Sequence, residues 1–432
     1  MNTIKSIHFY MVAVALLLVL ALVVAACSGS PEGPTPTGTI PPASTSVPES
    51  EEETPKETTP ESETAIPTAE AEEATPAPTP EPQVGIGHPA PELAGIHDWL
   101  NSQPLKISDL KGKVVLLDFW TYTCVNCIRT FPYLREWHAK YADHGLVILG
   151  VHTPEFEFEK KLENVDEATK EHDIGWPVAL DNDYITWRAF ENRFWPAKYL
   201  IDKDGILRYT HFGEGAYAET EAKIRSFLRQ TGVDLSVVDN TPQEDQAYDS
   251  SFPQDRSARV TRELYAGYLR GYNDALYGLG GFVWNREYYE GQNKVVDYVD
   301  PEDHFGDRIF LQGPWHNGPE SLKHARETTN YEDYIFLRLS AKSVNAVIKP
   351  EGEGAEPFKV LVTLDDEYLT DSNKGEDVVI EEDGRSFLYI DEPRLYSIIQ
   401  APEYGTYDLK LSSNSPHFAL YAFTFGVYES GI

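Results

Sequence analysis

Residues 113–134 have the sequence KVVLLDFWTYTCVNCIRTFPYL, and this stretch decides the fold of the part of the chain around it. Residues 113–120 are apolar and often β-branched, which is typical of a strand that is buried on both faces. Cys124 and Cys127 follow at once, and apolar residues then recur at helical spacing over 128–141. The stretch therefore predicts a buried strand, a cysteine pair and a helix, in that order.

A Cys-x-x-Cys pair between a strand and a helix favours a redox-active site. Cys124 lies where the helix begins, and the unpaired N–H groups and the dipole of a helix N-terminus favour a thiolate. Cys124 is therefore predicted to attack a disulfide bond. Cys127, one helical turn further on, is predicted to resolve the mixed disulfide that results.

Two other interpretations of the cysteine pair are weaker. Half of a zinc site would need further ligands, but the chain has only three Cys, and its twelve His show no ligand spacing near the pair. A purely structural disulfide across so short a loop would add little stability. We expect neither a metal nor a cofactor.

The residues around the pair resemble a known family. Asp118-Phe119-Trp120 and Pro132 match the thioredoxin pattern position for position. Four longer stretches resemble the TlpA-like thioredoxin domain of DipZ-type proteins: FWTYTCVNCIRTFPYL (119–134), VHTPEFEFEK (151–160), WPVALDND (176–183) and NRFWPAKYLID (192–202). Those proteins are extracytoplasmic thiol-disulfide oxidoreductases, often fused to a CcdA-like membrane electron transporter. The resemblance implies an α/β thioredoxin fold and protein dithiol or disulfide substrates.

The resemblance also assigns roles to individual residues. It implies a cis peptide bond before Pro196, which faces the disulfide and shapes a substrate groove together with Trp120 and Trp195; without it, an ordinary trans proline would be expected. Asp118 is a carboxylate in an apolar strand, which is costly unless its pKa rises or it is hydrogen-bonded. We expect Asp118 to accept the proton of Cys127, the alternative being a strand-end carboxylate in contact with water.

The first part of the chain predicts export and attachment to a membrane. Residues 1–27 combine Lys5, an apolar run and a Val24-Ala25-Ala26-Cys27 end that resembles a bacterial lipobox, so Cys27 is the expected lipidation site. An uncleaved anchor helix is the alternative. Residues 28–83 are rich in Pro, Thr, Ser, Glu and Ala and predict a disordered tether with an average reach of about 40 Å. A formal net charge of −34 argues against a nucleic-acid partner.

Three segments follow the tether. We expect a thioredoxin-like redox domain over 84–232, a linker over 233–258 and an all-β sandwich over 259–432. Within the redox domain, the expected strands are 146–152, 178–180, 198–201 and 206–212, and the expected helices are 155–172, 184–190 and 217–230. The third segment resembles the jelly-roll C-terminal domain of DipZ-type proteins, which is similar to a carbohydrate-binding module.

Large aromatic residues of the third segment are candidates for glycan contact, namely Trp284, Tyr288, Tyr289 and Trp315, with Trp284 and Trp315 foremost. Aromatic residues in β-sandwiches more often form the core, and fold alone does not carry function. A cell-wall glycan is therefore a hypothesis about a partner.

The sequence thus predicts a membrane-anchored, extracytoplasmic oxidoreductase that reduces protein disulfides and takes electrons from a separate membrane donor of CcdA type. A thiol peroxidase is the alternative enzyme, but its Pro-x-x-x-Thr-x-x-Cys pattern would need proline where the chain has Leu117. A surface glycan-binding lipoprotein with an accessory redox domain is the non-enzymatic alternative.

Overall fold

The computed structural model describes residues 85–253, 258–271, 281–352 and 355–429. Residues 78–432 form one compact unit, and its described part contains two separate sheets. We call residues 85–232 the first domain and residues 259–429 the second domain. The predicted signal peptide, Cys27 and the tether lie outside the described residues. No helix in the described part of the chain is both long and apolar enough to cross a membrane.

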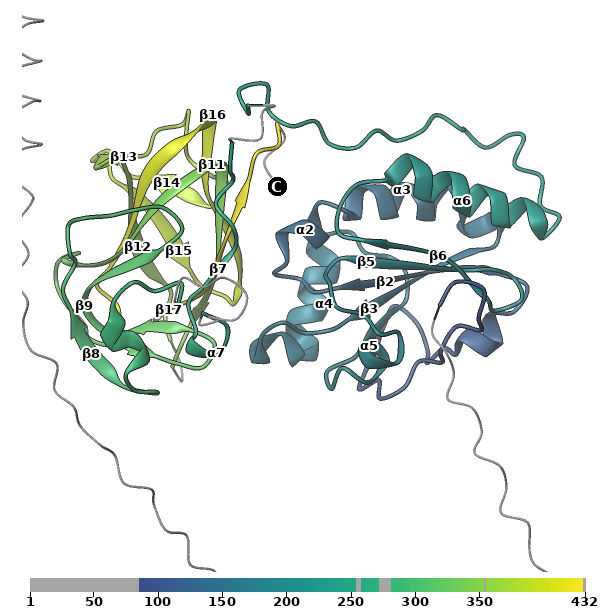
Figure 1. Cartoon of the computed structure of the whole chain (residues 1–432), viewed down its shortest axis with the longest axis horizontal. Coiled ribbons are helices and arrows are strands. Elements are labelled where there is room, and N and C mark those ends of the chain that lie inside the picture. The colour runs from purple at the N-terminus through teal and green to yellow at the C-terminus, as the bar shows by residue number, and fades with distance from the viewer. Residues whose placement is uncertain (1–84, 254–257, 272–280, 353–354, 430–432) are drawn as a thin grey trace, which may run out of the picture. The chain divides into compact units, whose positions relative to one another are not determined.

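The first domain has a thioredoxin-like α/β fold. Its six-stranded sheet has the order β1-β4-β3-β2-β5-β6 (Figure 1). Its elements are β1 (Trp99–Leu100), η1 (Ile107–Leu110), β2 (Val114–Trp120), α2 (Val125–Ile128), α3 (Phe131–Tyr141), η2 (Ala142–His144), β3 (Leu146–His152), η3 (Glu157–Lys160), α4 (Leu162–Glu171), β4 (Val178–Leu180), α5 (Ile185–Ala189), β5 (Ala197–Ile201), β6 (Leu207–Phe212) and α6 (Tyr217–Gln230).

The central strand β2 is buried along all seven of its residues, as its composition predicts. It pairs in parallel with β3 and antiparallel with β5. Because side chains alternate along a strand, one face of β2 contributes to a cluster that includes residues of α3 and α6, and the other face packs against α5. Figure 1 shows α3 and α6 together on one side of the sheet, with α5 on the other.

Two predicted helices are interrupted. The helix expected over 128–141 is divided into α2 and α3 at Arg129 and Thr130, and Pro132 occupies the first turn of α3, where a missing N–H costs nothing. The helix expected over 155–172 is divided into η3 and α4 at Lys161, which has an extended backbone, and the side chain of Glu159 in η3 is buried instead of facing water.

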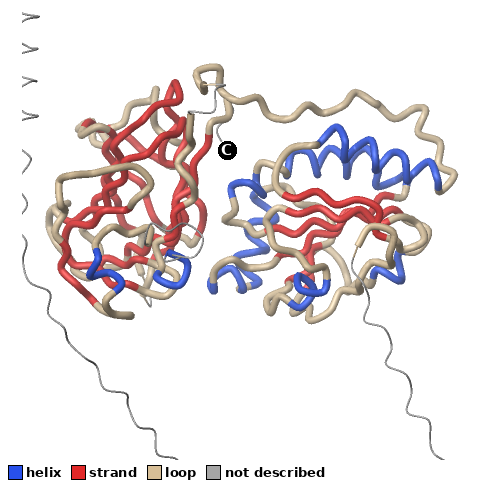
Figure 2. Tube along the Cα trace, in the orientation of Figure 1, coloured by secondary structure: helices blue, strands red, loops and turns tan. Residues whose placement is uncertain are grey.

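The second domain is all-β, consistent with the predicted sandwich (Figure 2). Its strands are β7 (Leu264–Tyr265), β8 (Val295–Tyr298), β9 (Ile309–Asn317), β10 (Leu322–His324), β11 (Asp333–Pro350), β12 (Phe358–Leu364), β13 (Glu367–Tyr368), β14 (Val378–Ile380), β15 (Ser386–Ile390), β16 (Arg394–Ser413) and β17 (Phe418–Gly426); its short helices are α7 (Tyr268–Gly271) and η4 (Arg286–Tyr289). The long pair β11 and β16 contains register shifts, which let the sheet bend around its core.

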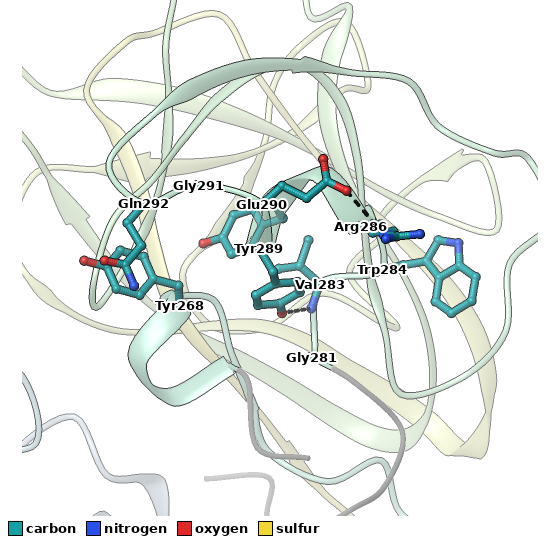
Figure 3. A pocket seen from close by; sticks show the side chains of 10 residues that line it. Tyr268, Gly281, Val283, Trp284, Arg286, Tyr289, Glu290, Gly291 and Gln292 are labelled. Atoms are coloured by element: carbon teal, nitrogen blue, oxygen red, sulfur yellow. Dashed lines mark hydrogen bonds and ion pairs between the residues drawn. The ribbon is translucent and has the colours of Figure 1, made fainter. Parts of the chain in front are cut away.

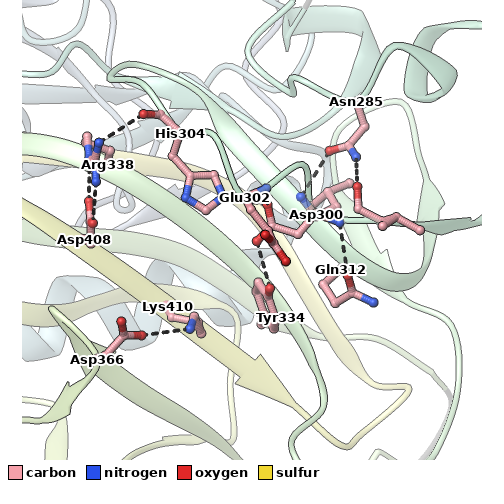
Figure 4. Close-up of polar contacts among 12 residues, drawn as sticks. Asn285, Asp300, Glu302, His304, Gln312, Tyr334, Arg338, Asp366, Asp408 and Lys410 are labelled. Atoms are coloured by element: carbon pink, nitrogen blue, oxygen red, sulfur yellow. Dashed lines mark hydrogen bonds and ion pairs between the residues drawn. The ribbon is translucent and has the colours of Figure 1, made fainter.

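A polar network fixes the loop between β8 and β9 to strand β11 (Figure 4). Asp300 accepts hydrogen bonds from Tyr334 Oη at 2.8 Å and from His304 Nε2 at 2.5 Å. Arg338 donates to the carbonyl of His304 at 3.0 Å and forms two hydrogen bonds of 2.7 Å with Asp408. The polar side chains of this network hydrogen-bond to one another or to the backbone of the same domain. This pattern is typical of a structural contact.

The described part of the predicted linker, 233–253, contains no helix or strand, but parts of it are packed. Leu235 is buried against the first domain's core, and Asp249 forms an ion pair with Lys342 of β11.

Candidate redox site

Cys124 and Cys127 lie at the end of the central strand, one on either side of the start of α2. Cys124 is the N-cap residue of that helix, and its Sγ accepts a hydrogen bond from the backbone N–H of Cys127 at 3.3 Å. Both cysteines are free thiols; Cys124 is partly exposed, whereas Cys127 is fully buried. This is the arrangement expected of an attacking cysteine and a resolving cysteine.

The expectation that the helix N-terminus lowers the pKa of Cys124 is wrong for this conformation. Burial raises the pKa of Cys124 well above its usual range, and its side-chain hydrogen bond with the Cys127 thiol and the nearby charge of Glu155 act in the same direction. Burial also raises the pKa of Cys127. A helix N-terminus stabilises a thiolate, but the loss of hydration is the largest effect on this thiol. Burial therefore disfavours the thiolate form of both cysteines in this conformation.

Asp118 lies in β2 with its carboxylate buried, and a buried lysine accompanies it. Lys198 is directly opposite Asp118 across β2 and β5, and Nζ lies 3.5 Å from Asp118 Oδ1. Burial raises the pKa of Asp118 to about 6, and the positive charge of Lys198 limits that rise. The charge of Asp118 also contributes to the raised pKa of Cys127. A carboxylate with this pKa can accept a proton near neutral pH.

The peptide bond between Trp195 and Pro196 is cis. Trp195 is half-buried, its Nε1 donates to the carbonyl of Thr153 at 3.0 Å, and it packs in the same cluster as Cys124. Trp120, in contrast, is 1% exposed and packs edge-on against Phe131. The prediction that Trp120 lines a substrate groove is therefore wrong: its ring belongs to the core because alternate residues of β2 face α3.

A second buried carboxylate, Glu159, lies against the turn that carries Cys124. Thr123 Oγ1 donates to Glu159 Oε1 at 2.5 Å, and the backbone N–H of Phe156 donates to Oε2 at 2.9 Å. Burial raises the pKa of Glu159 to about 7, and the charge of Glu155 adds to the rise. Sequence reasoning did not single out Glu159, because a glutamate in an acidic stretch is normally a solvated side chain.

Residues of the second domain contact the same loop of the first domain. Arg270 Nη1 lies 2.6 Å from Glu155 Oε1, and Tyr265 Oη donates to the same oxygen at 2.8 Å. Arg270 also lies over the ring of Tyr265, with its Cζ 4.4 Å from the ring centroid. These contacts neutralise a carboxylate whose charge would otherwise disfavour a thiolate at Cys124 more strongly.

The structure divides the candidate glycan residues into two groups. Trp315 and Tyr288 are fully buried in the core of the second domain, so the prediction that Trp315 contacts a glycan is wrong. Trp284 is 46% exposed and lines a cavity of about 530 Å³ together with Tyr289 (Figure 3). Tyr288 also lines this cavity, but of the four candidates only Trp284 is strongly exposed.

Both domains match models of known protein families. The family model described as AhpC/TSA family matches residues 86–210, and the model described as thioredoxin like C-terminal domain matches residues 261–426. Protein DipZ of Mycobacterium tuberculosis is 39% identical over 269 residues, which cover 61% of this chain and 35% of DipZ. The match thus spans about a third of the length of that relative.

Two shorter proteins match the first domain along nearly their whole length. Thiol-disulfide oxidoreductase YkuV of Bacillus subtilis is 34% identical over 146 residues, which cover 34% of this chain and 98% of YkuV. The solution structure of a thioredoxin-like protein in the oxidized form is 34% identical, with a TM-score of 0.31 over 33% of this chain and 97% of that one.

Proposed function

The chain belongs to the family of thioredoxin-like thiol-disulfide oxidoreductases, and from that premise we propose that it reduces disulfide bonds in proteins outside the cytoplasm through Cys124 and Cys127. The observation that carries the proposal is the geometry of the pair: a partly exposed Cys124 at the start of α2, and a buried Cys127 influenced by the Asp118 carboxylate.

The proposed reaction has two steps. Cys124 loses its proton, and the resulting thiolate attacks one sulfur of a substrate disulfide; a Cys124–substrate bond forms, the substrate S–S bond breaks, and the released substrate thiolate takes up the proton that Cys124 lost. Cys127 then transfers its proton to Asp118 and attacks Cys124 Sγ. The Cys124–Cys127 disulfide forms, the mixed disulfide breaks, and the second substrate sulfur leaves as a thiolate that takes the proton from Asp118, so that two electrons pass from the chain to the substrate.

The direction of electron flow is supported by the high pKa of both thiols. Strong disulfide oxidants stabilise their reduced form by stabilising a thiolate. Here burial disfavours the Cys124 thiolate, and the intervening Val125-Asn126 carries no positive charge. A cysteine pair of this kind is expected to have a low reduction potential and therefore to reduce a substrate disulfide.

A direct assay tests the proposed activity. The purified protein, supplied with dithiothreitol, is expected to accelerate the reduction of the interchain disulfides of insulin, and Cys124→Ser is expected to abolish the acceleration. Rapid consumption of hydrogen peroxide without insulin reduction would instead favour the thiol peroxidase.

The proposal includes attachment to the outer face of a membrane through lipid on Cys27, with 28–83 as the tether and a membrane protein of CcdA type as the electron donor. Cys27→Ala is expected to leave the protein unprocessed or to release it from the membrane fraction, with the activity of the folded part unchanged. One acyl chain binds membranes only marginally, so firm attachment requires a multiply acylated cysteine. Mass spectrometry of the mature protein checks this, and an intact 1–26 segment would contradict it.

A cell-wall glycan is a second candidate ligand, favoured by the exposed Trp284 beside the cavity shown in Figure 3. Trp284→Ala is expected to weaken retention on insoluble cell wall at least about fivefold, since stacking on one ring is worth about 1 kcal/mol or more. Exposed Val299→Ala serves as the matched control. Equal retention of wild type and both variants would contradict a glycan role for this cavity.

A further inference from the structure

Glu159 contacts the redox turn through hydrogen bonds that use both of its carboxylate oxygens. Oε1 accepts from Thr123 Oγ1 at 2.5 Å and from the backbone N–H of Thr123 at 3.4 Å. Oε2 accepts from the backbone N–H groups of Phe156, at 2.9 Å, and Glu155. The side chain is fully buried, as are the side chains of Thr123 and Phe156.

Only a carboxylate satisfies this set of donors. All four groups that face Glu159 in these bonds are N–H or O–H donors, and an ionised carboxylate has acceptors on both oxygens. A glutamine at this position would have to point its NH₂ group, itself a donor, either at the donors of Thr123 or at the N–H groups of Glu155 and Phe156. The desolvation of a carboxylate is costly, and hydrogen bonds from four donors offset it.

The segment held by Glu159 contacts three parts of the redox site. Thr153 donates its backbone N–H to the carbonyl of Trp120 at 3.0 Å, at the end of β2. The carbonyl of Thr153 accepts from Trp195 Nε1 at 3.0 Å, next to the cis peptide bond. Glu159, at the other end of the segment, holds Thr123, the residue before Cys124. Residues 153–159 therefore connect the cysteine turn to the segment before Pro196.

We propose that Glu159 and Thr123 are positioning residues, which fix Cys124 relative to the segment before Pro196 where a protein substrate presents its disulfide. This inference rests on the proposed function. Glu159 is not the proton acceptor of either cysteine, since none of its hydrogen bonds involves a cysteine and its oxygens are already used. It acts on the reaction through the placement of the Cys124 backbone.

Positioning of this kind affects protein disulfides and small reagents differently. Attack on a disulfide requires three sulfur atoms nearly in line, with the substrate held beside Pro196, and a displacement of about 1 Å can cost about 100-fold in rate. Alkylation by iodoacetamide requires only an accessible thiolate. Loss of the Glu159–Thr123 contact is therefore expected to slow the first reaction and to leave the second nearly unchanged.

The experiment compares two substitutions of Thr123 in the full chain, with Cys27→Ala as the common background. Thr123→Val keeps the shape but removes the hydroxyl, whereas Thr123→Ser keeps the hydroxyl. At pH 8, where Glu159 is ionised, Thr123→Val is expected to lower the rate constant for insulin reduction about tenfold and to change the iodoacetamide rate less than about twofold. Thr123→Ser is expected to restore the insulin rate.

Glu159→Gln is expected to cause a larger loss, with Glu157→Gln as its control, because Glu157 has a largely exposed side chain. Thr123→Val that reduces insulin at the wild-type rate, or that lowers both rates in proportion, would overturn the inference while leaving the proposed function intact. A wild-type protein that does not reduce insulin would remove the proposed function itself.

Discussion

Cys127→Ser is expected to accumulate a covalent mixed disulfide with protein substrates, whereas Cys124→Ser is expected to accumulate none. Cys124 is partly exposed and can reach a substrate, and Cys127 is fully buried and can reach only Cys124. Removing Cys127 therefore stops the reaction after the first bond has formed. Turnover of both variants is expected to fall at least about 1,000-fold, as for other enzymes that lose a reacting group.

Non-reducing electrophoresis and mass spectrometry measure the trapped species. The background carries Cys27→Ala, so that each variant has a single cysteine and any adduct identifies its position. A Cys124→Ser variant that traps substrate through Cys127 would reverse the assigned roles. Equal trapping by both variants would show that the burial of Cys127 does not control access.

Asp118→Asn is expected to slow the resolving step about 100-fold, because a general base contributes about 100- to 10,000-fold to a proton transfer. The pKa of Asp118 is about 6, and only the ionised form accepts a proton. In the wild type, the rate of release of the mixed disulfide should therefore rise with pH through about 6. Asp118→Asn should lose that step in the profile, and stopped-flow measurement of tryptophan fluorescence can follow it.

Lys198→Met is the companion variant. Lys198 limits the rise in the pKa of Asp118. Without the lysine charge, the pH at which the release of the mixed disulfide accelerates should therefore lie above 6. A profile that is identical in the wild type, Asp118→Asn and Lys198→Met would contradict the role of the pair.

The same pair makes folding stability depend on pH. The pKa of Asp118 rises from 3.8 in the unfolded chain to about 6 in the folded chain, so the folded state binds more protons between these values. The free energy of unfolding contributed by Asp118 therefore falls as pH rises from about 4 to about 6, and the full penalty is present above that. At pH 8, the double variant Asp118→Leu/Lys198→Met is expected to have a free energy of unfolding about 1–4 kcal/mol higher than that of the wild type, as is often found when a buried ion pair is replaced by apolar residues of similar volume.

The local parts of the fold follow from the sequence. The apolar run of β2, the Cys-x-x-Cys position and helix α6 over Tyr217–Gln230 agree with periodicity and composition. The break at Arg129–Thr130 comes just before Pro132, whose missing N–H is a local signal in the sequence. The break at Lys161 does not follow from periodicity, and the buried side chain of Glu159 nearby makes contacts that form only in the folded domain.

The sequence predicts a site residue well where its residue type is unusual for its surroundings. It predicts less well the residues that reach the site only through the pairing of strands. Asp118 is recognisable as a carboxylate in an apolar strand, but its partner Lys198 lies 80 residues away and meets it only through the pairing of β2 with β5. Trp120 and Trp315 are aromatic residues that the sequence could equally place in a groove or in a core, and the structure places both in cores. For Cys124, the sequence indicates the helix N-terminus but not the burial that outweighs it.

The reduction potential of the Cys124–Cys127 pair tests the central claim most directly. Equilibration of the purified protein against glutathione buffers, followed by alkylation and mass spectrometry, gives the fraction of the pair that is oxidised. The raised pKa of both thiols predicts a reducing pair, with a potential near that of thioredoxin, about −270 mV. A potential above about −150 mV, in the range of strong oxidants, would contradict a disulfide reductase.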